Sequence, residues 1–202
     1  MFRLPLTAGE SQRFVQAAQQ PGKVFVYPTE SFYALGCLAT DDLAVQQIFT
    51  LKQRPDHLPL LVLVSGFDQL RQFSGPLSSV QENFLSSHWP GPLSVLLPAC
   101  GLSKHLNPTG GPVAFRMPPV PDIRRLIQLT GVPWVGTSAN LSRSPSLTDL
   151  TEVRSWLGDQ VDLWIDGGDC PGGLASTVLS LDEQGGIKIL RQGQWLAPES
   201  HQ

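Results

Sequence analysis

Two cations stand two residues apart in the segment Lys52-Gln53-Arg54-Pro55. A residue before proline is biased toward extended backbone, and side chains two apart in an extended segment point to the same side. Lys52 and Arg54 are therefore candidates for one pocket, where an ammonium and a guanidinium group would bind phosphate. The alternative is that Lys52 complements the C-terminus of a predicted helix and Arg54 is solvated. The tetrapeptide alone favours this alternative.

A second group of polar residues, Ser138-Ala139-Asn140, directly follows an apolar segment that is predicted to be a strand, and Ser146 lies further along the same loop. Open α/β sheets place ligand contacts at the carboxyl ends of their strands. Serine and asparagine are also common in ordinary caps and turns. Taken locally, the two interpretations are nearly even.

A glycine-dense loop, Asp166-Gly167-Gly168-Asp169-Cys170-Pro171-Gly172-Gly173, runs toward Ser176-Thr177. Glycine lets backbone approach a ligand closely and offer N–H groups to an anion. A long surface turn would have the same composition. The sequence has no Gly-x-x-x-x-Gly-Lys-Ser/Thr motif, and no Gly-x-Gly-x-x-Gly follows its first predicted strand. A nucleotide would therefore be bound through neither common glycine-rich loop.

The sequence shows no pattern typical of a disulfide framework, a metal site or a serine nucleophile. Cys37, Cys100 and Cys170 are far apart, so neither a disulfide framework nor a zinc site is predicted. The four histidines show no metal-ligand spacing, and no Gly-x-Ser-x-Gly nucleophile signature occurs. We therefore predict no metal site formed by the protein.

The composition is that of a compact globular protein. The chain has 202 residues with 41% hydrophobic and 15% charged residues, which indicates one domain with a real core. The net charge of −3 is unlike that of an obligate nucleic-acid binder and leaves room for a local basic pocket. Residues 1–10 do not resemble a signal peptide, and no apolar run could span a bilayer, so we expect a cytoplasmic protein without membrane contact.

Helices and strands are predicted to alternate along most of the chain. A first helix opens on a capping box from Thr7 to Glu10 and ends before Pro21. Further helices are predicted at 42–52, 67–73, 79–85, 123–128 and 150–157, and strands at 24–27, 60–64, 93–97, 113–116, 132–136, 161–165, 177–181 and 187–190. This order, with its β-rich end, predicts a single α/β domain over residues 1–196 with a mixed sheet, followed by a frayed tail at 197–202.

Taken in order, these segments resemble the YrdC family of threonylcarbamoyl-AMP synthases over most of the chain. Pro28-Thr29-Glu30-Ser31-Phe32-Tyr33-Ala34-Leu35-Gly36 is similar to the family's Pro-Thr-Glu-Thr-x-Tyr-Gly-Leu-Gly motif. The other matching segments are Lys52-x-Arg54-Pro55, Trp89-Pro90-Gly91-Pro92-Leu93, Arg116-Met117-Pro118, Ser138-Ala139-Asn140, Gly172-Gly173 with Ser176-Thr177, and Leu190-Arg191 with Gly193. Any one segment is weak, but the ordered set outweighs the structural interpretation of Lys52.

The resemblance implies a twisted mixed sheet with flanking helices and a large concave basic pocket. It also implies an enzyme that joins L-threonine, bicarbonate and ATP into threonylcarbamoyl-AMP and pyrophosphate, with Mg²⁺ carried by the nucleotide. The product would pass to a transferase complex that modifies tRNA. Lys52 and Arg54 would be catalytic; the implied ATP contacts are Lys52, Arg54, Ser138, Asn140, Ser146 and Arg191, and the implied threonine contacts are Thr29, Arg116 and Ser176.

Several positions depart from the family pattern, and rival functions remain. Arg143 and Ala34 stand where many members have glycine, Ser31 replaces a threonine, and Leu63 falls where some long members have histidine. One rival is a protein of this fold that binds double-stranded RNA or tRNA without adenylation. Such relatives lack the Lys-x-Arg and Ser-Ala-Asn motifs, which this chain keeps. Because the net charge is −3, we expect any direct tRNA contact to be weak. Another is a synthase that acts on a different amine.

Overall fold

The computed structural model describes residues 1–55, 60–106, 108, 110–142 and 144–197. Its strands are β1 (Phe2–Arg3), β2 (Phe25–Pro28), β3 (Tyr33–Gly36), β4 (Leu61–Leu63), β5 (Leu93–Leu97), β6 (Val113–Arg116), β7 (Trp134–Ser138), β8 (Leu163–Asp166), β9 (Thr177–Leu181) and β10 (Ile187–Arg191). Its helices are α1 (Ala8–Ala18), α2 (Asp42–Lys52), α3 (Phe67–Ser74), α4 (Ser79–His88), α5 (Pro121–Thr130) and α6 (Leu150–Leu157), with a short 3₁₀ turn at Gly158–Gln160.

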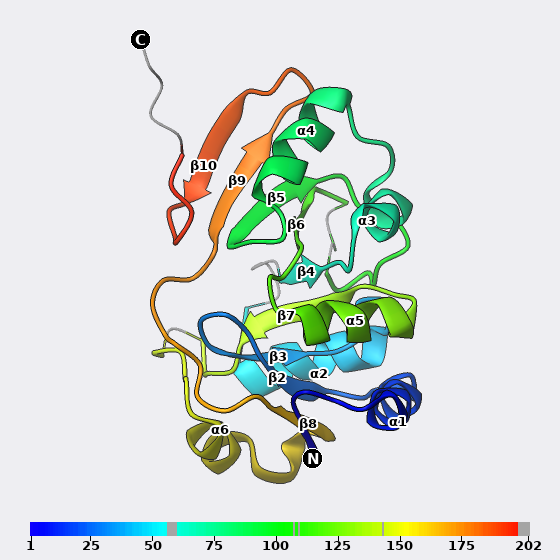
Figure 1. Ribbon diagram of the computed structural model, residues 1–202, viewed down its shortest axis with the longest axis vertical. Helices are drawn as coiled ribbons and strands as arrows, with labels where there is room; N and C mark the ends of the chain where they lie inside the picture. The colour runs from blue at the N-terminus through cyan, green and yellow to red at the C-terminus, as the bar shows by residue number, and fades with distance from the viewer. Residues whose placement is uncertain (56–59, 107, 109, 143, 198–202) are drawn as a thin grey trace.

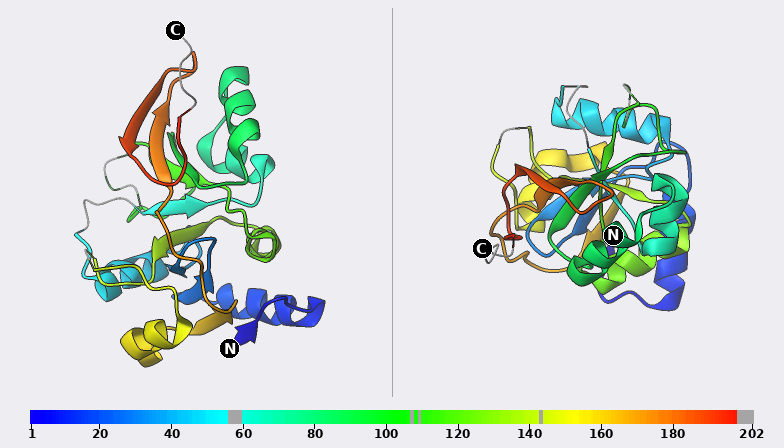
Figure 2. Two further views of the ribbon diagram at one scale, coloured as in Figure 1. Left: turned by 60° about the vertical axis from the view of Figure 1, so that its left-hand side comes forward. Right: turned by 90° about the horizontal axis from the view of Figure 1, so that it is seen from above.

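All ten of these strands form one sheet, in the order β1-β8-β2-β3-β7-β4-β6-β5-β9-β10. The sheet contains parallel pairs (β1 with β8, β2 with β8, β4 with β6, β5 with β9) as well as antiparallel ones, which confirms the predicted mixed sheet. The sheet runs along the long axis of the molecule, with β8 near one end and β10 at the other (Figures 1 and 2).

Helices cover both faces of the sheet and enclose two apolar clusters. One cluster packs α1 and α5 against the sheet around Phe14, Ile127 and Trp134. The larger cluster packs α2, α3, α4 and α6 against the sheet and contains Ile48 and Leu70. This burial follows the helical spacing of apolar residues in the sequence.

Local signals in the sequence set several helix ends. The predicted capping box is present at α1, where Thr7 and Glu10 bond to each other's backbone N–H. Asp41 caps α2 by accepting hydrogen bonds from the backbone of Leu43 and Ala44. At the other end of α2, Gln53 adopts a left-handed conformation with φ 47°. This conformation turns the chain sharply between Lys52 and Arg54.

Three strands differ from the sequence prediction. β1 and β3 were not predicted, and β7 lies two residues later than expected, so Ser138 is the last residue of the strand rather than part of the loop after it. All four residues of β3 are buried, so the strand lacks the alternating pattern that marks a strand with one exposed face. Residue 197, at the start of the expected tail, is exposed, and residues 198–202 lie outside the described part of the chain.

Candidate functional site

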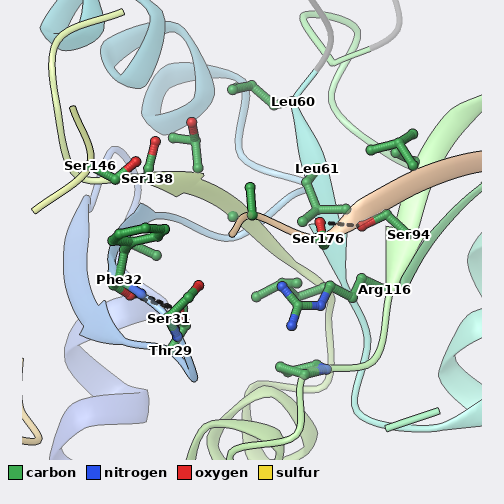
Figure 3. A pocket seen from close by; sticks show the side chains of 18 of the residues that line it. Thr29, Ser31, Phe32, Leu60, Leu61, Ser94, Arg116, Ser138, Ser146 and Ser176 are labelled. Atoms are coloured by element: carbon green, nitrogen blue, oxygen red, sulfur yellow. Dashed lines mark hydrogen bonds between the residues drawn. The ribbon is translucent and has the colours of Figure 1, made fainter. Parts of the chain in front are cut away.

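A cavity of about 450 Å³ opens on the sheet, within the usual size range of small-molecule sites. Both halves of the sheet contribute to its wall, from the β2–β3 turn to β10 (Figure 3). Of the predicted site residues, those that line it are Thr29, Arg54, Arg116, Ser138, Ser146, Ser176 and Arg191. Lys52 and Asn140 do not line it, although both were predicted to contact ATP.

Three arginines give the cavity a positive character. Burial lowers the pKa of Arg54, and nearby Arg191 lowers it further. Partial burial lowers the pKa of Arg191 as well, with an additional contribution from Arg116. Among the described residues that line the cavity, Glu30 is the one carboxylate, so their positive charge is in excess. The cavity is therefore suited to a ligand with several negative charges.

Lys52 lies behind the cavity wall and, unlike Arg54, is not among the residues that line the cavity. Its side chain is 1% exposed. Its Nζ atom donates hydrogen bonds to the backbone oxygens of Ser138 and Asn140 and, at 3.1 Å, to Oδ1 of Asn140. Because Gln53 is left-handed, residues 52–54 are not extended, and the alternation that would place both cations on one side does not apply.

Two features of its surroundings act in opposite directions on the charged form of Lys52. Burial, and secondarily the neighbouring Arg54, lowers the pKa of Lys52 to about 7. Three acceptor oxygens, however, match the three N–H donors of the charged form. The structural alternative from the sequence, a Lys52 that merely complements the helix end, is therefore also incomplete, because the side chain joins the end of α2 to the end of β7.

Asn140 continues this network along the loop that carries the predicted serines. Its Oδ1 accepts a 2.6 Å hydrogen bond from Oγ of Ser138, and its Nδ2 donates to the backbone oxygen of Ser144. Ser138 and Ser146 both line the cavity. Lys52 and Asn140 thus hold in place a loop whose serines reach the cavity. The departure at Arg143 lies outside the described residues.

Thr29 lines the cavity, but its hydroxyl is engaged within its own turn. The Oγ1 atom donates to the backbone oxygen of Phe32 at 2.7 Å and accepts from the backbone N–H groups of Ser31 and Phe32. This arrangement shapes the β2–β3 connection (Figure 3). Thr29 therefore has a structural role in forming the cavity wall in addition to any contact with a ligand.

Ser176 belongs to a polar cluster that includes a residue not identified from the sequence. Its Oγ lies 2.9 Å from Oγ of Ser94 on β5, and both side chains face the cavity (Figure 3). Arg191 donates through Nη2 to the backbone oxygen of Ser176 at 2.9 Å. Ser94 was missed because it sits within an apolar predicted strand distant in sequence from Ser176, although it directly follows the Trp89–Leu93 motif.

Arg116 is held from two sides. Its Nε donates to the backbone oxygen of Gly91 at 2.9 Å, which gives the Trp89-Pro90-Gly91 segment a direct structural purpose. Its Nη2 forms an ion pair with Oε1 of Glu30. Glu30 was also missed as a site residue, although it stands inside a motif singled out above. Its position beside Thr29 was the available signal.

The glycine-dense loop supports the cavity from outside. None of residues 166–173 is among the residues that line the cavity. The loop instead anchors the β2–β3 region: Tyr33 donates its hydroxyl to the backbone oxygen of Gly168 at 2.7 Å, and Gly172 donates to the backbone of Ser31. Gly172 and Gly173 have φ of 77° and 102°, which explains why glycine is needed there.

Two further observations concern the described residues only. They contain no group of three or more His, Cys, Asp and Glu side chains placed to hold a metal ion. None of the helices formed by these residues is both long and apolar enough to cross a membrane.

Comparison with curated proteins finds relatives that share one name. Threonylcarbamoyl-AMP synthase from Pyrococcus abyssi is 36% identical over 174 residues, which cover 85% of this chain and 51% of the relative. The enzyme of the same name from Bacillus subtilis is 36% identical over 81% of this chain and 48% of the relative. The chain thus spans about half the length of these two proteins. The Photobacterium profundum enzyme, 33% identical, is covered over 84% of its length.

Solved structures and a family model agree with this similarity. Sua5 from P. abyssi complexed with L-threonine aligns with a TM-score of 0.85 at 32% identity, over 95% of this chain and 56% of that one. Escherichia coli YciO aligns with a TM-score of 0.81 at 28% identity, over 95% and 94% of the two chains. The model of the Sua5/YciO/YrdC family, described as "Telomere recombination", matches residues 17–193. The chain therefore belongs to the Sua5/YciO/YrdC family.

Proposed function

We propose that this protein is a threonylcarbamoyl-AMP synthase, which joins L-threonine, bicarbonate and ATP and releases pyrophosphate. The observation that carries the proposal is the convergence of Arg54, Arg116 and Arg191 on one cavity, in a chain similar to enzymes of that name. All three substrates bear negative charge, and a cavity with surplus guanidinium groups lowers the cost of bringing them together.

The phosphate groups of ATP would occupy the side of the cavity that contains Arg54, Arg191, Ser138 and Ser146. Arginine offers a fork of N–H donors that matches phosphate oxygens, and serine hydroxyls add neutral donors. We assign Lys52 and Asn140 to this subsite as well, acting through the loop they hold rather than at the cavity surface. Lys52 would contribute its positive charge from behind the wall.

L-Threonine would bind on the side that contains Thr29, Arg116 and Ser176. Arg116 supplies a cation for the α-carboxylate, and the Ser94–Ser176 pair supplies hydroxyl groups. Leu63 and Ala114 lend this wall an apolar character.

The proposed reaction requires no protein nucleophile. The threonine amine captures bicarbonate as a carbamate, with loss of water. The carbamate oxygen then attacks the α-phosphorus of ATP in line, and pyrophosphate leaves. Catalysis would arise from positioning and charge neutralisation. Mg²⁺ would enter with the triphosphate, because it commonly binds through substrate phosphates and retained water.

The product fits a cytoplasmic pathway of tRNA modification. Threonylcarbamoyl-AMP is a reactive mixed anhydride, and we propose that a downstream transferase complex passes its threonylcarbamoyl group to tRNA. The synthase itself needs no tight contact with tRNA, which agrees with its net charge of −3.

Pyrophosphate release and product mass test the proposal directly. We expect pyrophosphate from ATP only when threonine and bicarbonate are both present, together with a product of the mass of threonylcarbamoyl-AMP. Orthophosphate release, or turnover without threonine, would overturn it. Equal turnover with another amine would identify a different carbamoyl-adenylate synthase. Tight RNA binding at near-physiological salt without adenylation would favour the RNA-binding alternative.

A further inference from the structure

Glu30 is an acidic residue of the cavity wall, and one of its two carboxylate oxygens has no hydrogen-bond partner among the described residues. Its Oε1 atom pairs with Nη2 of Arg116, and the Arg116 side chain is 7% exposed. Its Oε2 atom is buried and has no hydrogen-bond partner in the described structure. A carboxylate can accept up to about four hydrogen bonds, and a buried charged oxygen without a donor is costly. The described residues thus leave one oxygen of Glu30 without a donor, in a Glu30–Arg116 pair that lines the cavity.

We propose that Glu30 and Arg116 together recognise the two charges of an α-amino acid: Glu30 accepts the α-ammonium group and Arg116 binds the α-carboxylate. This inference rests on the proposed function and adds a binding residue to it. An α-amino acid carries its ammonium and carboxylate groups on one carbon atom, and the wall offers an anion and a cation in direct contact. Without substrate, these two protein groups satisfy each other.

Binding of the amino acid would then be an exchange of ion pairs. The α-carboxylate takes the place of Glu30 on Arg116, and the α-ammonium takes the place of Arg116 on Glu30. Rotation about the terminal torsion of glutamate is broad and exchanges its two oxygens at low cost. Gly91 continues to hold Arg116 through Nε during this exchange. In this bound state every charge that loses its partner gains a new one; the ammonium must then lose a proton before the amine can capture bicarbonate.

This exchange explains how the cavity would reject acids without an amine. A ligand with a carboxylate alone would separate Arg116 from Glu30 and leave the glutamate carboxylate unpaired in a largely buried place. Breaking one side of a buried ion pair is strongly unfavourable. The zwitterion also adds no net charge, so Arg54 and Arg191 remain available for the triphosphate.

Equilibrium binding to matched ligands tests this inference. The ligands are L-threonine and (R)-3-hydroxybutyrate, which lacks the amine. The proteins are the wild type, Glu30→Gln and the control Glu183→Gln, whose residue is exposed in the β9–β10 turn. We expect the wild type and the control to bind threonine at least about tenfold more tightly than 3-hydroxybutyrate. Glu30→Gln should bind threonine at least about tenfold more weakly than wild type and discriminate less than about threefold.

Further measurements separate a binding role from a structural one. ATP affinity of Glu30→Gln should stay close to wild type, because Glu30 lies on the amino-acid side of the cavity. Its melting temperature should fall, because the buried Arg116 loses its charged partner and keeps only a neutral acceptor. Glu30→Asp, which keeps the charge, should retain part of the preference for threonine. If Glu30→Gln does not fold, the inference is still tested by the wild type and Glu30→Asp. Equal affinity of the wild type for L-threonine and (R)-3-hydroxybutyrate would overturn it.

Different results would contradict this inference and the proposed function. A wild-type protein that neither binds threonine nor releases pyrophosphate with it would contradict the function. An active wild type together with a Glu30→Gln variant of unchanged affinity and discrimination would contradict only the role of Glu30.

Discussion

The Nζ atom of Lys52 lies 2.7 Å from the backbone carbonyl oxygen of Asn140, so the last residue of α2 is bonded to the loop that follows β7. The two residues are 88 positions apart in the chain. The same ammonium also bonds to the backbone oxygen of Ser138, which lines the cavity. One buried cation thus fixes a section of the cavity wall without reaching the cavity itself.

Replacing Lys52 by methionine should reduce both stability and turnover. The substitution keeps much of the volume but removes the donors to two backbone oxygens, each at a cost of about 1–3 kcal/mol when left unpaired and buried. The loop that carries Ser138 would loosen, and the KM for ATP should rise. Thermal melting and pyrophosphate-release kinetics measure both effects, with Lys104→Met as an exposed control. Native-like melting with lost turnover would instead indicate that the ammonium acts directly on phosphate.

The stability of the wild type should depend on pH through Lys52. Burial and Arg54 lower its pKa to about 7 in the folded protein, whereas the pKa of a lysine in an unfolded chain is about 10.4. Between these values the unfolded state binds the extra proton, so the free energy of unfolding rises with pH. Denaturant unfolding of the wild type and Lys52→Met between about pH 7 and 9 should show the wild type gaining relative stability. A constant difference would mean that the three oxygens keep the ammonium charged.

Arg54→Ala should weaken ATP more than threonine. Arg54 lies in the cavity wall, where burial and, secondarily, repulsion from Arg191 lower its pKa; a ligand phosphate would relieve that repulsion. A hydrogen bond to a charged group contributes about 1.5–3 kcal/mol, which corresponds to roughly a 10- to 100-fold rise in the KM for ATP. Steady-state kinetics with each substrate varied in turn measure this split. Arg125→Ala, an exposed change on α5, should alter neither KM; a matched loss in both variants would remove Arg54 from the phosphate site.

Alanine at Gly193 should disrupt the site, whereas alanine at Gly9 should not. A Cβ atom at Gly193 would lie 2.2 Å from the backbone oxygen of Ala175 and 2.6 Å from that of Ser176, so the backbone that carries Ser176 would have to move. Gly9 lies in α1 with nothing within 4 Å of such an atom, and alanine there should stabilise by about 0.5–1 kcal/mol. Gly193→Ala should therefore lower the melting temperature and raise the KM for threonine, whereas Gly9→Ala should raise the melting temperature and leave that KM unchanged. A fully active Gly193→Ala protein would contradict the close packing described here.

Local signals in the sequence were sufficient for most of the fold. Capping residues such as Thr7, apolar periodicity and glycine turns act over a few residues, so helix positions and most strands could be predicted. β3 could not be predicted in this way, because a short strand buried on both faces has no alternation, and alanine and glycine have weak strand preference. The order of strands in the sheet depends on pairings between distant segments, which no local pattern encodes.

The candidate site, like the fold, could be predicted from the sequence only in part. The sequence by itself determined which residue types are available: the ordered motifs include Arg54, Arg116 and Ser176, and all three line one cavity. Only the tertiary structure decided where each side chain points. The left-handed Gln53 directs Lys52 into the wall, and the neighbouring strands bring Ser94 to Ser176 and the β2–β3 turn brings Glu30 to Arg116. Side-chain direction depends on backbone dihedral angles and on packing between residues far apart in the chain, so motif spacing alone could not specify it.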